Sequence, residues 1–164
     1  MTQHLFSYLR PMEEADLPWV MSVEDRAYSF PWTMQGFENS LDQGLNFILC
    51  SSDGQSLGYV CLLTVLDEVH VLNYCVSPDF QKRGVGGAAL LKLKEKLKDS
   101  GFSIILLEVR ASNLAAQTLY LQNAFNKDGV RKDYYRSLEW NDALFCQQEV
   151  KEDAVLMSCC LSTL

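Results

Sequence analysis

The sequence predicts one α+β domain over residues 1–164, with a mixed, mostly antiparallel central sheet that is flanked by helices. Three observations predict this fold class. The chain has the length of one ordinary domain with a buried core. Hydrophobic residues make up 48% and charged residues 21%, a balance typical of globular rather than disordered proteins. Strand patterns with short connections come first, and strand and helix patterns alternate after them.

The first half of the chain is expected to form two helices and three strands. Apolar residues recur with helical spacing over Ala15–Tyr28, where Asp16 is placed as an N-cap before Pro18. A second, short helix is expected over Thr33–Leu41. The expected strands are Leu45–Cys50, Leu57–Leu66 and Glu68–Val76. Because only short turns connect these strands, they should pair antiparallel.

The second half is expected to alternate helices and strands. Pro78 ends the preceding strand because proline cannot continue a central ladder. A long helix is expected over Gly84–Lys98, and Ile104–Val109 is aliphatic enough for a central strand. Ser112-Asn113 offers the N-cap of the next helix. Two strands, near Val130–Arg136 and Ala154–Leu161, are expected on either side of a polar stretch around Trp140.

Charge is unevenly distributed along the chain. The formal net charge is −7, yet residues 81–98 carry six bases and one acid. This stretch favours an anionic ligand, whereas residues 1–80, with eleven acids and two bases, favour a cationic partner. A solvated helix face is the alternative for Lys92–Lys98, but Lys82 and Arg83 adjoin glycines. Overall acidity argues against nucleic-acid binding.

Hydropathy and cysteine placement predict a cytoplasmic protein with neither a membrane partner nor a metal site. No apolar run approaches the roughly 20 residues that span a bilayer, and no signal-peptide pattern opens the sequence. The six cysteines form no CxxC pair, and both histidines lie far from them in the sequence. We therefore expect buried thiols in a reducing compartment rather than disulfides or a structural zinc.

A glycine-rich turn precedes the long helix. Gly84, Gly86 and Gly87 let the backbone approach a ligand, and the first amides of a helix lack internal partners. Those amides and the helix dipole suit a pyrophosphate, with Lys82 and Arg83 adding positive charge. The structural alternative is a tight turn whose glycines serve close packing.

A dinucleotide-binding fingerprint is a rival interpretation of this turn. Gly84–Ala89 satisfies GxGxxA, and Glu108 lies nineteen residues further on. That fingerprint requires its first glycine directly after a strand, but residues 77–83 intervene. The preceding strands also resemble an antiparallel meander, so we place this interpretation second.

The sequence resembles a known family. Asn73–Gly86, NYCVSPDFQKRGVG, resembles the cofactor motif of the GNAT acetyltransferases, whose core is Q/R-x-x-G-x-G/A after a strand. Leu107–Asn113 (LEVRASN) and Leu119-Tyr120 resemble one branch, the ribosomal-protein-alanine N-acetyltransferases (the RimI type). Three further segments are similar to that branch: Tyr28–Thr33 (YSFPWT), Tyr134-Tyr135 and Glu152–Ala154 (EDA). The resemblance covers roughly residues 10–161.

The resemblance implies an enzyme that moves an acetyl group from acetyl-CoA to the N-terminal α-amine of a protein. It makes Glu108 the general base and Tyr120 the general acid, and needs no metal. The implied acceptor is a basic protein N-terminus. The branch that the sequence resembles implies, more specifically, the N-terminal alanine of a small-subunit ribosomal protein. The implied cofactor contacts are the backbone of Tyr74, Cys75 and Val76, the turn formed by Lys82, Arg83, Gly84, Val85, Gly86 and Gly87, and Asn113.

The residues themselves leave these roles open. Glu108 alternates in phase with Ile104 and Leu106, and such apolar surroundings would raise the pKa of a carboxyl group. Its alternative is a strand-end glutamate that is exposed or paired with Arg110. Tyr120 lies in the stripe of a helix, where an aromatic residue is by default part of the core.

Two departures from the family bear on the acceptor. Ala124 stands where a glycine is expected, and Ser137–Val150 is longer than usual and carries Trp140 and Phe145. A GNAT-type enzyme for a small-molecule amine or a different protein N-terminus is therefore the alternative function. A non-catalytic CoA-binding module is the third hypothesis, and it would be expected to lack the Glu108 and Tyr120 pair.

Overall fold

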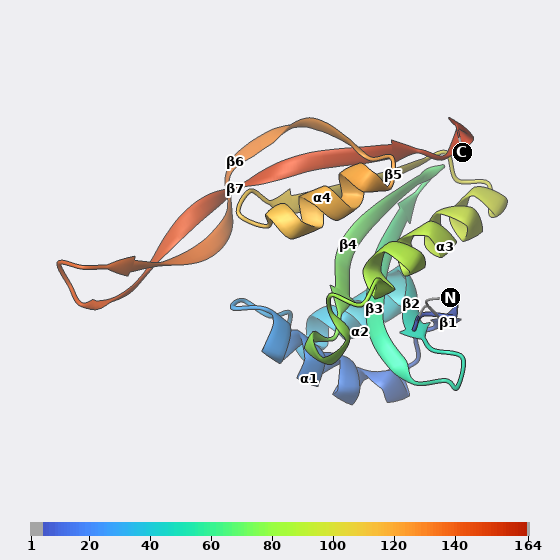
Figure 1. Cartoon of the computed structure of the whole chain (residues 1–164), viewed down its shortest axis with the longest axis horizontal. Coiled ribbons are helices and arrows are strands. Elements are labelled where there is room, and N and C mark those ends of the chain that lie inside the picture. The colour runs from blue at the N-terminus through green and yellow to red at the C-terminus, as the bar shows by residue number, and fades with distance from the viewer. Residues whose placement is uncertain (1–4, 164) are drawn as a thin grey trace.

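One seven-stranded sheet organises the computed structural model, which describes residues 5–163 (Figure 1). The strands are β1 (Tyr8–Pro11), β2 (Leu45–Cys50), β3 (Ser56–Val65), β4 (Glu68–Val76), β5 (Ile104–Arg110), β6 (Asn126–Asn141) and β7 (Cys146–Cys160). Their order is β1-β2-β3-β4-β5-β7-β6. Between residues 5 and 163, only β4 and β5 pair parallel. The predicted mixed, mostly antiparallel sheet is confirmed, and this topology excludes the doubly wound dinucleotide fold.

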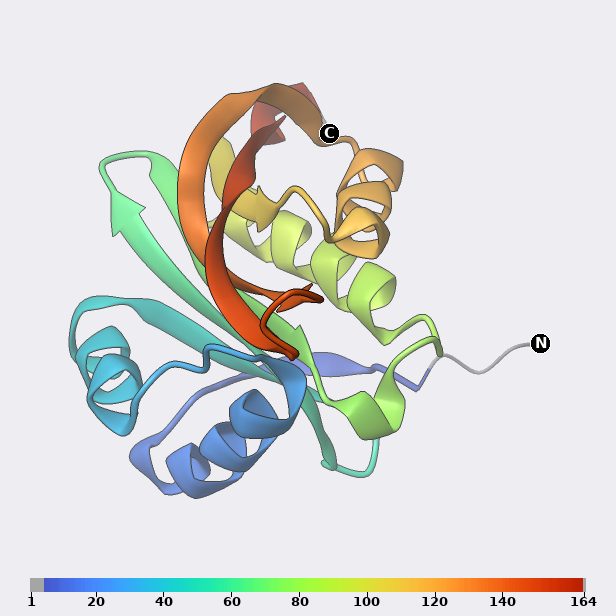
Figure 2. The same cartoon turned by 90° about the vertical axis from the view of Figure 1, so that its left-hand side faces the viewer.

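Helices cover both faces of the sheet (Figures 1 and 2). On one face lie α1 (Leu17–Ala27) and α2 (Met34–Gln43); on the other lie α3 (Val85–Asp99) and α4 (Leu114–Gln122). Short 3₁₀ turns complete the chain: η1 (Glu14–Asp16), η2 (Pro78–Phe80) and η3 (Leu161–Thr163). Each pair of helices packs on its own hydrophobic core, so the sheet separates two cores. No helix among the described residues is long and apolar enough to cross a membrane.

Several local predictions are confirmed. Asn113 Oδ1 caps α4, as predicted, by accepting the Ala116 N–H at 3.1 Å. The expected short helix is present as α2, and the Thr33 hydroxyl caps it by accepting the Gly36 N–H at 3.1 Å. Cys50, Cys61, Cys75 and Cys159 are buried, as expected, but Cys146 and Cys160 are exposed, so the expectation of buried thiols is wrong for these two. Ala124, at the expected glycine position, adopts a left-handed backbone with φ of 65°.

Asp16 stands at the N-cap position of α1, as predicted, but its side chain accepts no hydrogen bond from that helix. Its carboxylate instead accepts the Glu13 N–H at 2.8 Å and pairs with both terminal nitrogens of Arg10 at 2.9 Å. Hydrogen bonding to the Arg10 guanidinium holds the pKa of Asp16 below its usual value. Arg10 lies on β1, a strand that the sequence pattern did not predict. The ion pair therefore ties the first strand to the turn before α1.

The predicted ends of the last two strands are also wrong. Instead of a polar connection around Trp140, β6 and β7 continue pairing from Tyr135↔Glu152 out to Asn141↔Cys146. The two strands form a twisted ribbon that projects from the body of the protein (Figure 1). Both faces of this ribbon contact solvent, so its residues lack the apolar alternation by which a half-buried strand is recognised.

The sheet opens between β4 and β5. The parallel pairing runs from Glu68↔Ile104 to Val71↔Leu107 and stops there. At that point a bulge leaves Leu72 as an extra residue in β4, because Val71 pairs with Leu62 and Asn73 pairs with Cys61. A bulge bends its strand. The carboxyl ends of β4 and β5 consequently diverge. Of the predicted site residues, Tyr74, Glu108, Asn113 and Tyr120 line this opening.

Candidate active site

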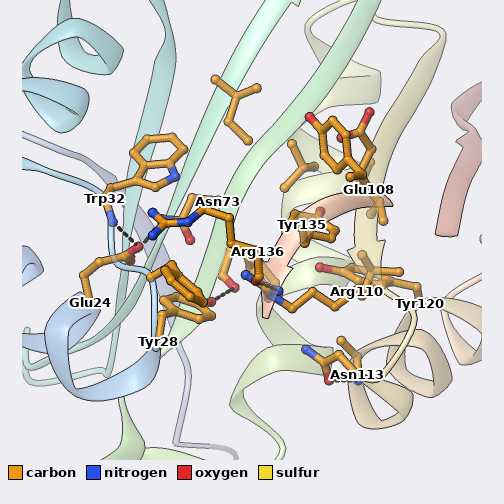
Figure 3. Close-up of a pocket in the computed structure, with 18 residues that line it drawn as sticks. Glu24, Tyr28, Trp32, Asn73, Glu108, Arg110, Asn113, Tyr120, Tyr135 and Arg136 are labelled. Atoms are coloured by element: carbon orange, nitrogen blue, oxygen red, sulfur yellow. Dashed lines mark hydrogen bonds between the residues drawn. The ribbon is translucent and has the colours of Figure 1, made fainter. Parts of the chain in front are cut away.

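A cavity of about 560 Å³ occupies the opening between β4 and β5 (Figure 3). Its lining comes from α1, the α1–α2 loop, β4, β5, α4 and β6. In Figure 3, Glu24, Tyr28 and Trp32 lie on one side, and Glu108, Asn113 and Tyr120 lie on the opposite side. Because helices from both faces of the sheet contribute, the cavity joins the two faces.

The β4 side of the cavity presents backbone groups. Ser77 N–H bonds to Leu57 O at 2.8 Å, and an antiparallel ladder alternates the direction of its hydrogen bonds. The N–H and C=O groups of Tyr74 and Val76 therefore point away from β3, toward the opening, whereas those of Cys75 point toward β3. In agreement, the Tyr74 carbonyl accepts the Tyr28 hydroxyl at 3.2 Å.

The glycine turn lies at the N-terminus of α3, as predicted. Gly84 has a φ of 78°, a left-handed conformation that favours glycine. No side chain among the described residues caps α3, so the first amides of that helix remain available to a ligand. Side chains added at Gly86 or Gly87 would touch Leu119 of α4 at 3.4 to 3.6 Å. Because these two glycines have no side chains, α3 can pack closely against the Leu119 side chain of α4.

The other turn residues surround this helix terminus. Lys82 and Arg83 are exposed, and Val85 is buried against the core. None of residues 82–87 is among those that line the cavity, but Tyr74 connects the two places. Its hydroxyl donates to Gly86 O at 2.6 Å, and burial raises its pKa so that it stays protonated. The N-terminus of α3 and the cavity are therefore held in a fixed relation.

Glu108 projects from β5 into the β6 side of the cavity. Its Oε1 atom lies 3.0 Å from Arg131 Nη1. A hydrogen bond to Glu108 raises the pKa of the Tyr134 hydroxyl. Arg110, the partner that the sequence suggested, pairs instead with Glu152 at 2.8 Å. Glu108 is thus a half-buried carboxylate that is held by two side chains of β6.

Tyr120 lies in α4 with its ring packed against Phe125, at 5.3 Å between ring centroids. It is 7% exposed and lines the cavity. Figure 3 shows its hydroxyl directed into that space. Burial raises the pKa of this hydroxyl, which is therefore protonated at neutral pH. The ring belongs to the core, as its stripe position predicts, while the hydroxyl faces the cavity.

A bulge in β6 brings two adjacent tyrosines into the same cavity. Tyr134 and Tyr135 both line it, although neighbouring side chains of a regular strand point to opposite faces. The register shifts between Arg131 and Tyr135, and Asp133 has a φ of 51°. Asp153 Oδ1 accepts the Asp133 N–H at 2.9 Å and so stabilises this bend.

Sequence reasoning missed Glu24, a buried carboxylate of α1 that also lines the cavity. It accepts the Trp32 N–H at 3.1 Å, Asn73 Nδ2 at 3.0 Å and the hydroxyl of Tyr59 (Figure 3). Glu24 thereby joins the α1–α2 loop to β4. The available signal was an acid with helical spacing in the apolar stripe of α1.

Arg136 connects β6 to the α1–α2 loop at the mouth of the cavity. Its guanidinium lies 4.4 Å from the centre of the Phe30 ring and pairs with Glu149 of β7 at 2.8 and 2.9 Å. Sequence reasoning missed this residue as well, because its partners are remote in the sequence.

Cys75 is a poor nucleophile in this setting. Burial raises the pKa of its thiol to about 11, so the thiol is neutral at pH 7.

An opened sheet beside a glycine-capped helix is the architecture of an acyl-CoA-dependent acetyltransferase, and residues 8–125 match the acetyltransferase (GNAT) family model. The chain belongs to the GNAT acetyltransferases. It is 36% identical over 148 residues to the [ribosomal protein bS18]-alanine N-acetyltransferase of Escherichia coli strain K12, covering 90% of this chain and 93% of that protein.

Solved structures agree with this assignment. The crystal structure of the ribosomal-protein-S18-alanine N-acetyltransferase from Escherichia coli superposes with a TM-score of 0.81 at 34% identity, over 94% of this chain and 93% of that one. A Bacillus subtilis acetyltransferase in complex with CoA superposes with a TM-score of 0.71 at 19% identity, over 93% and 97%. The second likeness shows the fold alone.

Proposed function

We propose that this chain acetylates the N-terminal α-amine of a protein with acetyl-CoA, and that the acceptor is the alanine of a small-subunit ribosomal protein. The E. coli relative carries that activity in its name. The observation that carries the proposal is the cavity itself, which joins the face of α3 to the face of α1 and α2. Acetyl-CoA and a protein N-terminus can then reach one reaction centre from opposite faces of the sheet.

The cosubstrate binds on the α3 face. Its pyrophosphate accepts hydrogen bonds from the first amides of α3, around Val85 to Gly87, and Lys82 and Arg83 add positive charge. The backbone groups of Tyr74 and Val76 face the opening and pair with the pantetheine arm. Those of Cys75 point toward β3, so the cofactor contact predicted for its backbone is dropped from the proposal. Asn113 Oδ1 is used as the cap of α4, which leaves Nδ2 as the group for a cofactor contact.

The acceptor amine binds on the Glu108 side. Glu108 takes a proton from the α-ammonium group, directly or through a water molecule, and the neutral nitrogen attacks the thioester carbonyl carbon. The N–C bond forms, and the carbonyl oxygen becomes an oxyanion that the Val76 N–H stabilises. Glu108 is held in place for this step by Arg131 and Tyr134.

Tyr120 completes the transfer. When the tetrahedral intermediate collapses, the C–S bond breaks and the thiolate of CoA leaves. The buried Tyr120 hydroxyl is protonated at neutral pH and donates its proton to that sulfur. The nitrogen, which is positively charged after its attack, loses its second proton to solvent, and Glu108 releases the first one there as well. Solvent returns a proton to Tyr120, so that the products are the N-acetylated protein, CoA and one proton.

The test is release of the CoA thiol from acetyl-CoA by the purified protein. An alanine-starting basic peptide should be turned over, whereas the same peptide with a blocked N-terminus should not. Spermidine serves as the small-amine control. Faster turnover of spermidine than of the peptide would overturn the proposal in favour of a small-molecule acetyltransferase.

A further inference from the structure

The outer part of the β6–β7 ribbon, residues 137–150, is an arm that the chemistry above does not use (Figures 1 and 2). Its strands pair from Ser137↔Val150 to Asn141↔Cys146. Since β5 pairs with β7 only from Ala154 onward, the arm has no third strand among the described residues. Exposed strand edges are a liability that proteins usually limit. An arm of this length therefore calls for a binding partner.

Large apolar side chains are concentrated on the arm. Trp140 is 59% exposed and Phe145 is 81% exposed. Leu138 and Leu144 are also exposed. A cluster of exposed apolar side chains marks an interaction site more often than apolar side chains that are scattered singly over the surface. Aromatic residues are also the residue type that contributes most to binding at protein interfaces.

The end of the arm is fixed in shape. Asn141 Oδ1 accepts the N–H groups of Ala143 at 3.0 Å and Leu144 at 3.1 Å, and Asn141 Nδ2 donates to Gln148 Oε1 at 2.8 Å. Such side-chain bonds define the turn. The apolar groups are therefore presented without a large loss of conformational entropy on binding.

One face of the arm begins at the mouth of the active site. Arg136, Leu138 and Trp140 alternate along β6 and share a face. Arg136 itself lines the cavity and lies over Phe30. Four strand residues span about 13 Å, which an extended peptide covers with roughly four residues. A chain that leaves the cavity past Arg136 can follow this face outward.

Charge identifies the kind of partner. Residues 137–150 carry Glu139, Asp142 and Glu149 and no lysine or arginine, a formal charge of −3. Because Glu149 pairs with Arg136, Glu139 and Asp142 supply the negative charge that a partner meets. Opposite charges steer association, and an exposed tryptophan face attracts lysine and arginine side chains. The fitting partner is a basic segment with interspersed apolar residues.

We propose that the arm of residues 137–150 docks the acceptor protein downstream of its N-terminus, so that the enzyme recognises an extended basic segment as well as the residue it acetylates. This inference rests on the proposed function, since the occupant of the arm is the protein whose N-terminus enters the cavity. Trp140 is the main contact along the face, and Leu144 and Phe145 contact the acceptor beyond it.

The experiment compares a short and a long acceptor. Two alanine-starting peptides share their first residues, one of about four residues and one of about fourteen with a basic extension. The wild type should prefer the long peptide, and the double variant Trp140→Ser/Phe145→Ser should lower kcat/KM for it about tenfold. The short peptide should be turned over equally by both proteins. Leu66→Ser, at an exposed turn between β3 and β4, is the matched control and should change neither value.

Three results would overturn the inference. Equal losses on both peptides would mean that the arm supports the active site instead of docking the acceptor. Unchanged turnover of the long peptide would mean that the arm does not contact it. A wild-type dimer that the double variant converts to a monomer, measured by sedimentation without acceptor, would assign the arm to a second copy of this chain.

A failure of the proposed function gives a different pattern. If the wild type turns over neither peptide, the acetylation proposal fails. Fluorescence polarisation of a labelled long peptide then still tests the arm, because binding that weakens in the double variant supports docking, and unchanged binding contradicts it.

Discussion

The β4 side and the β5–β6 side of the cavity differ in what they present. On the β4 side, Tyr74 and Val76 offer backbone groups to the opening. The Tyr28 hydroxyl donates to Tyr74 O, and Glu24 accepts hydrogen bonds from Trp32 N–H and Asn73 Nδ2, so that the strand and its neighbouring loop are held together. On the β5–β6 side, charged side chains, Glu108 and Arg131, are half exposed. In the reaction that we propose, the backbone groups recognise the invariant part of the thioester, whereas the side chains perform proton transfer and acceptor recognition. Substitutions on the two sides should therefore separate acetyl-CoA binding from turnover of the acceptor.

The largest effect is expected at Glu108. Glu108→Gln keeps the size of the side chain but cannot take a proton, so kcat/KM for the peptide should fall at least about 100-fold. The affinity for acetyl-CoA, measured by calorimetry, should stay at the wild-type value. Full turnover at neutral pH would remove Glu108 from the role of base.

Tyr120→Phe should have the next largest effect. The variant keeps the ring packed against Phe125 and removes the hydroxyl, so the folded state should be retained. We expect kcat to fall roughly tenfold, since the thiolate must then be protonated by water. Stopped-flow measurement of thiol release checks this, with thermal unfolding as the control for folding. Unchanged kinetics would return Tyr120 to a purely structural role.

Substitutions of Asp153 test whether the β6 bulge positions Tyr134 and Tyr135 for binding of the acceptor peptide. Asp153→Ala removes the acceptor of the Asp133 N–H and should raise KM for the peptide roughly fivefold through misplaced tyrosines. Asp153→Asn retains an oxygen at the same place and should behave like the wild type. An Asn variant as impaired as the Ala variant would show that the carboxylate charge matters rather than the bend.

Tyr74 tests the opposite side of the cavity. Tyr74→Phe deletes the bond to Gly86 O and should weaken acetyl-CoA binding about threefold, while KM for the peptide stays constant. Titration calorimetry with CoA measures the affinity directly. A change in the peptide KM with no change in CoA affinity would contradict the assignment of acetyl-CoA binding to the β4 side and of acceptor turnover to the β5–β6 side.

The smallest effect concerns stability alone. Ala124 follows the last turn of α4 with a φ of 65°, a conformation that costs an alanine free energy but suits glycine. Ala124→Gly should raise the free energy of unfolding by about 1 kcal/mol. Chemical denaturation measures this, and the kinetic constants should not change. A destabilised variant would mean that the entropy of glycine in the unfolded chain outweighs the relief of strain.

Much of the fold is local and could be predicted from the sequence. Leu45–Cys50 and Glu68–Val76 are apolar runs bounded by turns, and the structure places β2 and β4 at these residues. Gly84 was identifiable because a helix that begins after a left-handed residue favours glycine there.

The partners within the site could not be predicted. Glu108 meets Arg131 only because β6 lies beside β7 and bends at Asp133, which no local pattern encodes. Glu24 collects hydrogen bonds from residues on β3, β4 and the loop after α1. The arm escaped detection because strands solvated on both faces show no apolar alternation. The roles of Glu108 and Tyr120 followed from family resemblance, and the structure supplies their surroundings.

The most direct test locates the transferred acetyl group. An alanine-starting peptide that also contains internal lysines is incubated with the protein and acetyl-CoA and then sequenced by tandem mass spectrometry. The account predicts a single acetyl group on the N-terminal α-amine. Acetylation of a lysine side chain, or an unmodified peptide in the presence of intact, folded protein, would contradict it.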